Sequence, residues 1–391
     1  MTTKSGADFC LLLAVNPIEF DFRLLRLSQA LEQRVAQVII LGLGEALEPD
    51  FPGWPARVRL ASRPLAQVGG AVPRAALSAL SYLRLVLETA GQLRGRKGLV
   101  WAVDADTLAF GWLVSKLLGC PLIYDAHEFW PAESRRRGLT RLLQQVERSL
   151  IGRAQGVVTV SPAIAAAYQD LYRLARRPVV LLNAPSCESP SPPAPLNLGR
   201  SGVPTLLYQG HLHSSRRLLE FIGVFRELAP PMRLALVGYG PLANRLRALQ
   251  GPDLVVHGPI APRELLSVTR TASAGLLLLD GDNVNHQMSL CNKLFEYIHA
   301  GIPILASAVS PQTNEILEQF GVGTVFVGYS RQAVAEGLTR LRTWLENPAK
   351  FRPCFEAARS ALCWEQESRK LDGLLAAARG CCSRDRSSAD V

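Results

Sequence analysis

The segment Ser289–Ser307, SLCNKLFEYIHAGIPILAS, decides the fold because it shows a helix that passes directly into a strand. Three apolar side chains recur at helical spacing: Leu294, Phe295 and Ile298. Gly301 is the residue type that commonly ends helices, and the apolar run Ile304–Ala306 predicts a buried strand. We therefore predict a helix that begins near Ser289–Cys291, runs to His299 and is followed by that strand.

Two polar side chains on this predicted helix indicate a ligand site. Lys293 and Glu296 are three residues apart, so they share one side of the helix near its N-terminus. Free backbone N–H groups there favour a phosphate, and the lysine adds a positive charge. The carboxylate one turn later can accept hydrogen bonds from ribose hydroxyls. The alternative is an ordinary salt bridge on a surface helix.

Outward from this segment, short apolar runs alternate with helical patterns. Six runs in the first half of the chain predict buried strands: Phe9–Val15, Ala36–Gly42, Gly98–Val103, Pro121–Tyr124, Val157–Val160 and Val179–Leu182. Helical patterns lie between them: Leu24–Arg34, Ala75–Leu93, Leu108–Leu118 and Leu139–Arg153. This alternation predicts an α/β fold with a parallel sheet covered on both faces.

The stretch Ala184–Pro204 interrupts the alternation with prolines and serines, a linker composition. Six more strands follow it: Thr205–Tyr208, Arg233–Val237, Leu254–His257, Gly275–Leu279, Ile304–Ala306 and Thr324–Val327. The predicted parts are a domain over 1–185, a linker over 186–204, a domain over 205–356, a helix over 357–380 and a disordered tail over 381–391. The helix, which contains Trp364, could pack on either domain. Ligands bind at the carboxyl ends of such strands, so we expect the site in a cleft between the two doubly wound domains.

Composition limits the function classes. The chain has 391 residues, 48% hydrophobic and 19% charged, which indicates globular domains rather than disorder. Its net charge of +10 is compatible with nucleic acid, an anionic membrane, phosphorylated ligands or simply a solvated basic surface. The sequence contains no basic stretch interleaved with aromatic residues, so nucleic acid is not the expected partner. Eight cysteines without CxxC spacing, no signal peptide and no apolar run of about 18 residues predict a cytoplasmic protein whose membrane contact, if any, is peripheral.

The opening segment closely resembles the donor-binding signature of the GT-B glycosyltransferases of family 4, NKLFEY–AG–P–AS. The resemblance implies two Rossmann-like domains that face each other across a cleft, with Lys293 on the donor diphosphate and Glu296 on the ribose. It places three further residues in the same donor-binding segment: Ser289, Leu290 and Asn292. The family usually has another glutamate eight positions before Glu296. Here that position is Met288, with polar Asn285 and His286 nearby.

Three other elements of the second domain resemble the same family. The run after its first strand is similar to the pattern G-R-L-x-x-x-K-G, with Gly210 where backbone and ligand approach closely and Arg216 in the lysine position. His211 and Arg217 depart from the family residues. Gly238 belongs to a VGxGP-like turn, and His257 to a loop whose backbone meets the nucleobase in the family.

In the first domain, the run LIYDAHEFWP at 122–131 lies at the carboxyl end of a predicted strand. His127 could donate a hydrogen bond to the sugar or the leaving phosphate, and Asp125 or Glu128 could accept the acceptor's hydroxyl proton. The alternative is a turn held by local hydrogen bonds. The run resembles a YDxHE element found in a subset of the family.

Two Asp-x-Asp pairs, Asp104–Asp106 and Asp280–Asp282, match the metal-binding pair of the other glycosyltransferase architecture. The pattern is frequent by chance and the two-domain layout argues against that architecture, so we predict no metal. We still place Asp106 on the acceptor side of the cleft.

A basic stretch precedes one predicted helix of the first domain and continues along it: Arg135, Arg136, Arg137, Arg141, Arg148 and Arg153. The apolar stripe of that helix consists of Leu139, Leu142, Leu143, Val146 and Leu150. This pattern is typical of a helix that docks on anionic lipid, but the stripe can equally face the core.

The resemblance implies a retaining, metal-independent glycosyltransferase without a cofactor. It would move a sugar from a UDP- or GDP-sugar to a glycan or lipid-linked acceptor in polysaccharide or cell-envelope synthesis, on the inner face of the membrane. His127, Arg216 and Lys293 are the predicted catalytic residues. Two alternatives stay open: an epimerase or hydrolase of the same fold, and a non-catalytic partner subunit.

Overall fold

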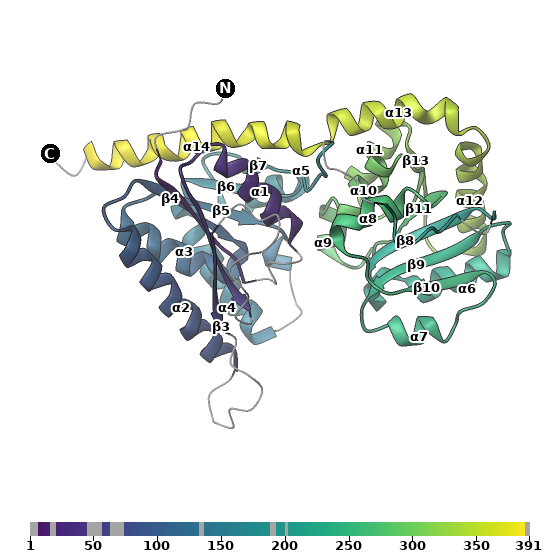
Figure 1. The fold of residues 1–391 in the computed structure, drawn as a ribbon, viewed down its shortest axis with the longest axis horizontal. Coiled ribbons are helices and arrows are strands. Elements are labelled where there is room, and N and C mark those ends of the chain that lie inside the picture. Colours follow the sequence, from purple (N-terminus) through teal and green to yellow (C-terminus); the bar gives the residue numbers. More distant parts are fainter. Residues whose placement is uncertain are drawn as a thin grey trace. The chain divides into compact units, whose positions relative to one another are not determined.

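The computed structural model describes residues 7–15, 21–44, 57–62, 74–132, 137–187, 193–199 and 202–387. The chain divides into two compact units (Figure 1). Unit 1 comprises Met1–Leu181 and Ser368–Val391, and unit 2 comprises Leu182–Glu367. The chain therefore leaves unit 1 once and returns to it near its C-terminus.

Unit 1 is built on a sheet of seven strands, all paired in parallel, in the order β3-β2-β1-β4-β5-β6-β7. The strands are β1 (Phe9–Leu13), β2 (Val38–Gly44), β3 (Arg57–Ser62), β4 (Gly98–Val103), β5 (Leu122–Ala126), β6 (Gly156–Thr159) and β7 (Val179–Val180). Helices α2 (Arg74–Leu93), α3 (Asp104–Leu118) and α4 (Arg137–Leu150) cover one face. The other face carries α1 (Phe22–Glu32), α5 (Pro162–Tyr172) and α14 (Trp364–Ser387). The strand order reverses between β1 and β4, where ligands of doubly wound sheets bind.

Unit 2 repeats this plan with six parallel strands in the order β10-β9-β8-β11-β12-β13. The strands are β8 (Thr205–His211), β9 (Arg233–Tyr239), β10 (Leu254–His257), β11 (Ala274–Leu277), β12 (Ile304–Ser307) and β13 (Gly323–Phe326). The helices are α6 (Leu218–Leu228), α7 (Ala243–Arg247), α8 (Pro262–Thr269), α9 (Val284–Met288), α10 (Asn292–Ala300), α11 (Pro311–Phe320), α12 (Arg331–Glu346) and α13 (Pro348–Ala361). The predicted α/β architecture is confirmed in both units.

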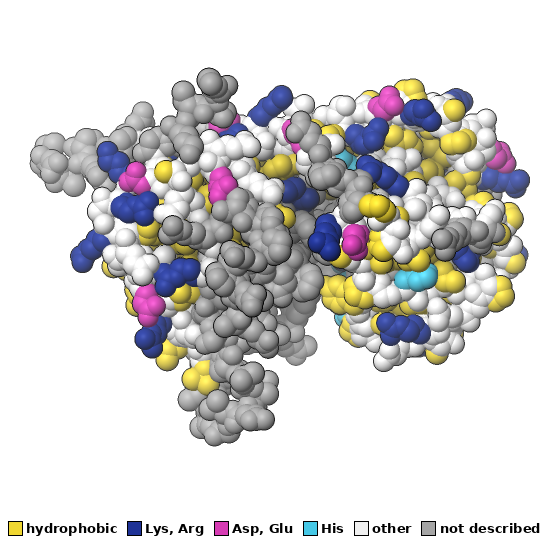
Figure 2. Space-filling model, in the orientation of Figure 1, with side chains coloured by type: hydrophobic (Ala, Val, Ile, Leu, Met, Phe, Trp, Pro, Cys, Tyr) yellow, Lys and Arg dark blue, Asp and Glu magenta, His cyan; other side chains and the backbone are white. Residues whose placement is uncertain are grey.

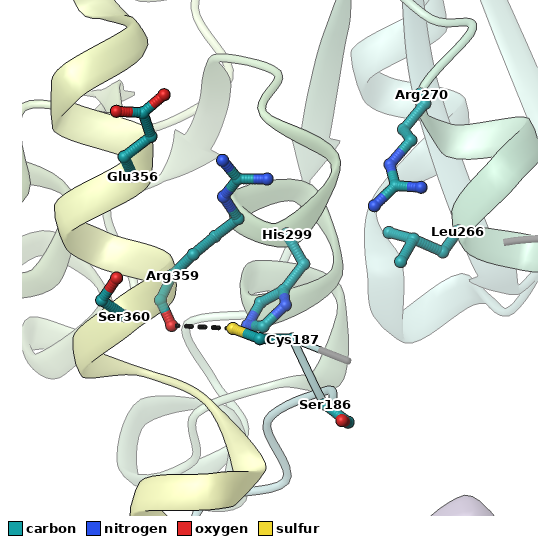
Figure 3. Close-up of a pocket in the computed structure, with 8 residues that line it drawn as sticks. All are labelled: Ser186, Cys187, Leu266, Arg270, His299, Glu356, Arg359 and Ser360. Atoms are coloured by element: carbon teal, nitrogen blue, oxygen red, sulfur yellow. Dashed lines mark hydrogen bonds between the residues drawn. The ribbon is translucent and has the colours of Figure 1, made fainter. Parts of the chain in front are cut away.

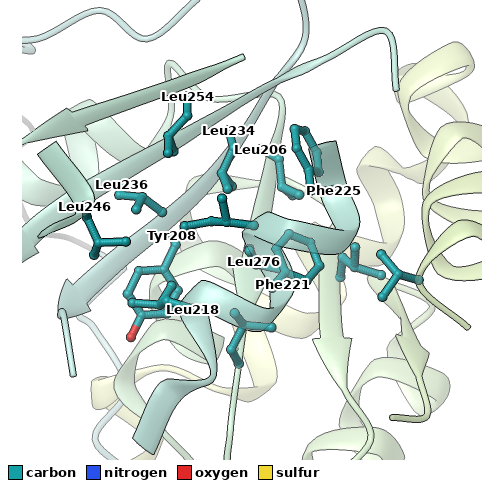
Figure 4. Close-up of a cluster of buried hydrophobic side chains, with 14 of the residues drawn as sticks. Leu206, Tyr208, Leu218, Phe221, Phe225, Leu234, Leu236, Leu246, Leu254 and Leu276 are labelled. Carbon is teal, nitrogen blue, oxygen red and sulfur yellow. The ribbon is translucent and has the colours of Figure 1, made fainter. Parts of the chain in front are cut away.

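The core of unit 2 explains why its strands read as continuous apolar runs. Leucines of β8, β9 and β10 meet Phe221 and Phe225 of α6, and all are buried (Figure 4). A strand covered on both faces has no solvent side, so polar alternation is absent. Burial of each such side chain contributes roughly 1.5–3 kcal/mol, which fixes the strand ends that carry the polar residues described below.

The structure differs from the sequence predictions at four places. Residues 57–62 form β3, which the sequence pattern missed. Helix α3 begins at Asp104, so the first Asp-x-Asp pair lies in its first turn. The predicted helix over 357–380 is two helices, α13 and α14, and α14 continues through Ser387 into the expected tail. Residues 388–391 of that tail, and 188–192 and 200–201 of the linker, lie outside the described residues.

Candidate functional site

Asp104 organises the polar end of unit 1. It directly follows β4 and has a positive φ of 61°, an uncommon conformation for a residue other than glycine. Its Oδ1 accepts hydrogen bonds from the His127 backbone N–H at 2.9 Å and from the Trp130 indole N–H at 3.2 Å. The carboxyl ends of β4 and β5 are thereby joined, as expected for neighbouring parallel strands.

His127 lies between two carboxylates. Its Nδ1 is 3.6 Å from Asp104 Oδ2 and its Nε2 is 3.5 Å from Asp125 Oδ2, and 19% of the side chain is exposed. Burial alone would lower the pKa of His127, but Asp104 and Asp125 together raise it to about 9. The imidazole is therefore cationic at neutral pH and can stabilise negative charge on a departing phosphate.

Asp125 has a different position from the one predicted for a proton acceptor. Its side chain is fully buried, ion-paired to Arg23 at 2.8 Å and hydrogen-bonded by the Trp101 indole N–H at 3.2 Å. Burial would raise the pKa of Asp125, yet the charges of Arg23 and His127 hold it well below its usual range. In this arrangement Asp125 stays ionised beside His127, which favours orienting the imidazole over accepting a proton.

The other two acceptor-side candidates flank this group. Burial, and then the neighbouring Asp104 carboxylate, raise the pKa of Asp106 to about 8. Asp106 is therefore protonated at neutral pH, and its buried Oδ1 has no hydrogen-bond partner within the described parts of the chain. Glu128 is half-buried, and its backbone carbonyl oxygen lies 3.2 Å from the Tyr168 hydroxyl oxygen. Their roles toward an acceptor stay predictions.

In unit 2, Lys293 lies against the turn that ends β8. Gly210 has a φ of 117°, and a Cβ added there would come within 3.4 Å of Lys293 Nζ. The same Nζ is 5.1 Å from the centre of the Tyr208 ring. Helix α10 begins at Asn292, and its N-cap residue Cys291 makes no side-chain cap. A cation, a bare glycine backbone and an open helix N-terminus are thus gathered in one place, the chemistry that binds phosphate.

Glu296, one turn along α10, is held by a residue that the sequence reasoning missed. Gln209 Nε2 donates a hydrogen bond to Glu296 Oε2 at 2.5 Å, and Gln209 Oε1 accepts one from the Thr269 hydroxyl at 2.8 Å. Gln209 is only 1% exposed. A polar residue inside an otherwise apolar strand was the signal that could have identified it, since a buried amide needs partners.

Two adjacent arginines after β8 have different surroundings. Arg216 ends a short 3-10 helix (Ser214–Arg216) rather than opening α6, and its buried Nη1 has no hydrogen-bond partner among the described residues. Arg217 pairs with Asp280 and Asp282, both at 3.1 Å, and with Glu220 at 2.9 Å. The second Asp-x-Asp pair is therefore ion-paired to Arg217, whereas Arg216 has a donor that an anion could accept.

The remaining predicted donor residues are distributed around this group. Gly238 has a φ of 153° and packs so tightly that an added Cβ would lie 1.9 Å from the Gly210 carbonyl oxygen. His257 ends β10 half-buried, where burial and then Arg233 lower its pKa.

The other three predicted donor residues lie at or just before the start of α10. Asn292 Oδ1 accepts a hydrogen bond from Asn183 at 2.8 Å. The Ser289 carbonyl accepts one from the Ser310 hydroxyl, and Leu290 is buried. Their contacts with a nucleotide stay predictions.

A separate pocket of about 260 Å³ in unit 2 contains none of the predicted site residues (Figure 3). It is lined by Ser186, Cys187, Leu266, Arg270, His299, Glu356, Arg359 and Ser360. Next to this pocket lie Cys187, Cys363 and Glu365, whose sulfur and carboxylate oxygen atoms are within 4.8 Å of one another. Within the described parts of the chain, this is the group of side chains that could hold a metal ion. The predicted site residues therefore do not coincide with either feature.

Comparison with protein families assigns both units. Residues 22–184 match the glycosyl transferase 4-like domain, and residues 203–343 match the glycosyl transferases group 1 domain. No curated protein sequence matches the chain.

Solved structures resemble the whole chain. Sucrose-phosphate synthase from Thermosynechococcus elongatus superposes with a TM-score of 0.72 at 17% identity, covering 96% of this chain and 100% of that one. HepE from Anabaena, in complex with UDP-glucose, gives 0.67 at 14% identity, covering 94% and 99%. The α,α-trehalose 6-phosphate synthase from Burkholderia multivorans gives 0.65 at 14% identity, covering 98% of each chain. At these identities the likeness concerns the fold.

Proposed function

Because this chain belongs to the glycosyltransferases of group 1, with a GT-B fold, we propose that it moves a sugar from a UDP- or GDP-sugar to a glycan or lipid-linked acceptor. The observation that carries the proposal is Lys293 beside Gly210 at the open N-terminus of α10. Solved proteins of this fold bind UDP-glucose and UDP-2-fluoro glucose, which supports a nucleotide-sugar as donor.

In the proposed reaction, unit 2 holds the donor and unit 1 supplies His127. Lys293, Arg216 and the first backbone N–H groups of α10 stabilise the departing diphosphate, while Glu296 accepts hydrogen bonds from the ribose. The bond between the sugar's anomeric carbon and the phosphate oxygen breaks. The acceptor oxygen bonds to that carbon from the same face, and its proton passes to the leaving phosphate. The protein contributes mainly positioning and electrostatics, and configuration is retained.

We also propose that the transfer needs no metal and no cofactor. In each Asp-x-Asp pair the carboxylates already interact with other groups of the protein. Asp104 accepts two hydrogen bonds at the His127 loop and the pKa of Asp106 is raised, whereas Asp280 and Asp282 pair with Arg217. Guanidinium and ammonium groups supply the positive charge that a metal would otherwise bring to the diphosphate.

The proposed acceptor is lipid-linked, at the cytoplasmic surface of a membrane in polysaccharide synthesis, and α4 supports this. Leu139 is 41% and Leu142 59% exposed, and Arg141 and Arg148 lie exposed on the same helix. Arg135 and Arg136 lie outside the described residues. On the face shown in Figure 2, Lys and Arg side chains are spread out rather than gathered in one patch, so this proposal depends on α4. No described helix combines the length and apolarity needed to cross a bilayer.

A vesicle assay tests the docking proposal. We expect the protein to sediment with vesicles containing phosphatidylglycerol but not with pure phosphatidylcholine, because the helix combines apolar and cationic groups. The double substitution Leu139→Ser with Leu142→Ser should reduce the bound fraction several-fold. Leu171→Ser, at a leucine of α5 that is 53% exposed, is the matched control. Equal binding of both variants would refute α4 as the docking element.

The proposed activity is tested by incubating the protein with UDP- and GDP-sugars, with and without acceptor lipids. We expect nucleoside diphosphate to be released with one donor, only when an acceptor is present. An isomerised or hydrolysed sugar without acceptor would instead identify an epimerase or hydrolase. Donor binding without any product would favour the non-catalytic subunit, an alternative that Met288 in the usual glutamate position keeps open.

A further inference from the structure

A fully buried carboxylate on α4 is not used by the proposed chemistry. Glu147 is 0% exposed and accepts three tyrosine hydroxyls. Tyr124 of β5 and Tyr168 of α5 donate to its Oε1 at 2.5 and 2.7 Å, and Tyr172 of α5 donates to its Oε2 at 2.8 Å. Burial raises the pKa of Glu147, although the tyrosines act against the shift. Burying such a group is costly, so its hydrogen bonds must be kept intact.

Helix α4 buries polar side chains beside half-buried apolar ones, Leu143, Val146 and Leu150. Thr140 and Glu147 are buried, whereas Leu139 and Leu142 are exposed. Gln144 Nε2 adds hydrogen bonds to the backbone carbonyls of Trp130 at 3.0 Å and Pro131 at 3.3 Å. Specific polar contacts thus join α4 to the segment after β5.

Tyr168 connects Glu147 to that segment. Its hydroxyl donates to Glu147, and its oxygen accepts the Trp130 backbone N–H at 3.3 Å. The same hydroxyl is 3.2 Å from the Glu128 carbonyl, a second acceptor toward which its single proton can turn. The Glu147 Oε1 is the nearer acceptor, at 2.7 Å against 3.2 Å, and takes the hydroxyl hydrogen bond, so the tyrosine oxygen can accept the Trp130 N–H. The Trp130 indole N–H in turn bonds Asp104, which holds the His127 backbone N–H.

We propose that Glu147 is a positioning residue: through Tyr168 and Trp130 it fixes the loop 127–130 and with it the His127 imidazole between Asp104 and Asp125. An effect of Glu147 on catalysis depends on the role proposed above for His127. The placement itself can be tested without activity, because Trp130 lies inside the chain of hydrogen bonds.

The test uses Tyr168→Phe and Glu147→Gln, with Tyr172→Phe as the matched control. Tyr172 bonds the same glutamate, but its hydroxyl has no hydrogen bond to the loop in the described residues, and phenylalanine keeps its ring stacked on Tyr168. The full-length protein is labelled with 5-fluorotryptophan, and the fluorine resonance of Trp130 is assigned by its loss in Trp130→Phe. Because the chain has six tryptophans, the other five report on the remaining structure.

Tyr168→Phe and Glu147→Gln should shift or broaden the Trp130 resonance and lower kcat on the order of 10- to 100-fold, with an unchanged Kd for UDP. Tyr172→Phe should leave resonance and kcat near wild type. An unmoved Trp130 resonance in Tyr168→Phe, or equal effects of Tyr172→Phe and Tyr168→Phe, would overturn the proposal. If Glu147→Gln does not fold, Tyr168→Phe decides alone. If no nucleotide-sugar is turned over, the proposed function fails, while the Trp130 resonance still decides whether Glu147 positions the loop.

Discussion

Lys293 and His127 are two of the three cationic side chains in the proposed chemistry, beside Arg216, and the neighbours of these two determine what each can do. Lys293 lies over the Tyr208 ring and beside Gly210. Its charge is therefore next to a glycine backbone that a phosphate can approach closely. His127 is held as a cation by Asp104 and Asp125. The first site favours a diphosphate, and the second favours the developing negative charge of a transition state.

The charge state of His127 makes stability depend on pH. Its pKa rises from 6.5 to about 9 in the folded protein. The stabilisation is therefore complete below pH 6.5 and is lost as pH rises through about 9. We expect His127→Gln to lower the free energy of unfolding by roughly 1–3 kcal/mol at pH 6, with the difference shrinking above pH 9.

Urea denaturation between pH 6 and pH 10 measures this difference. His257→Gln is the control, because burial lowers the pKa of His257 and its protonation therefore destabilises the fold only at low pH. A His127→Gln deficit that stays constant across the range would contradict the ion-pair account.

The positions of the candidate site residues at strand ends and on one helix could be predicted from the sequence, but their hydrogen-bond and ion-pair partners could not. Lys293 and Glu296 could be placed together because both lie on one helix. Asp125 was interpreted as a proton acceptor because the sequence does not show that Arg23, 102 positions away, buries and pairs it. Gln209 was missed for the same reason, since its partner Glu296 is 87 positions away.

At the level of elements, local signals predicted most strands and helices. Continuous apolar runs mark strands buried on both faces, and Gly301, with a φ of 75°, ends α10 as expected. The missed strand β3 contains Arg57 and Arg59 and forms the edge of its sheet, where charged residues are common. Apolarity alone cannot identify such a strand.

The glycine turn after β9 gives a test at this scale. Gly238→Ala would place a Cβ 1.9 Å from the Gly210 carbonyl oxygen, at a φ of 153° that suits only glycine. We expect it to lower the free energy of unfolding by more than about 2 kcal/mol, measured by urea denaturation. Gly258→Ala, where an added Cβ has no neighbour within 4 Å, should change it by less than about 0.5 kcal/mol. Equal effects would show that the turn tolerates a side chain.

For the whole molecule, the sequence predicted two α/β domains but not the role of the C-terminal helix. Helix α14 contributes its first residues to unit 2 and the rest to unit 1. Leu371, Leu374 and Leu375 are buried, and Asp372 pairs with Arg34 at 2.7 Å. An apolar stripe predicts that a helix packs but not on which surface, because complementary residues such as Arg34 lie far earlier in the chain, here 338 positions from Asp372.

The most direct test of the central claim is calorimetric titration of UDP, GDP and ADP into the wild-type protein, Lys293→Ala and Lys350→Ala. Lys350 is an exposed lysine of α13 and serves as the control. We predict that one nucleoside diphosphate binds the wild type with one site per chain, that Lys293→Ala weakens it on the order of 10- to 100-fold, and that Lys350→Ala does not. Absence of binding by every diphosphate, or unchanged affinity in Lys293→Ala, would contradict the account.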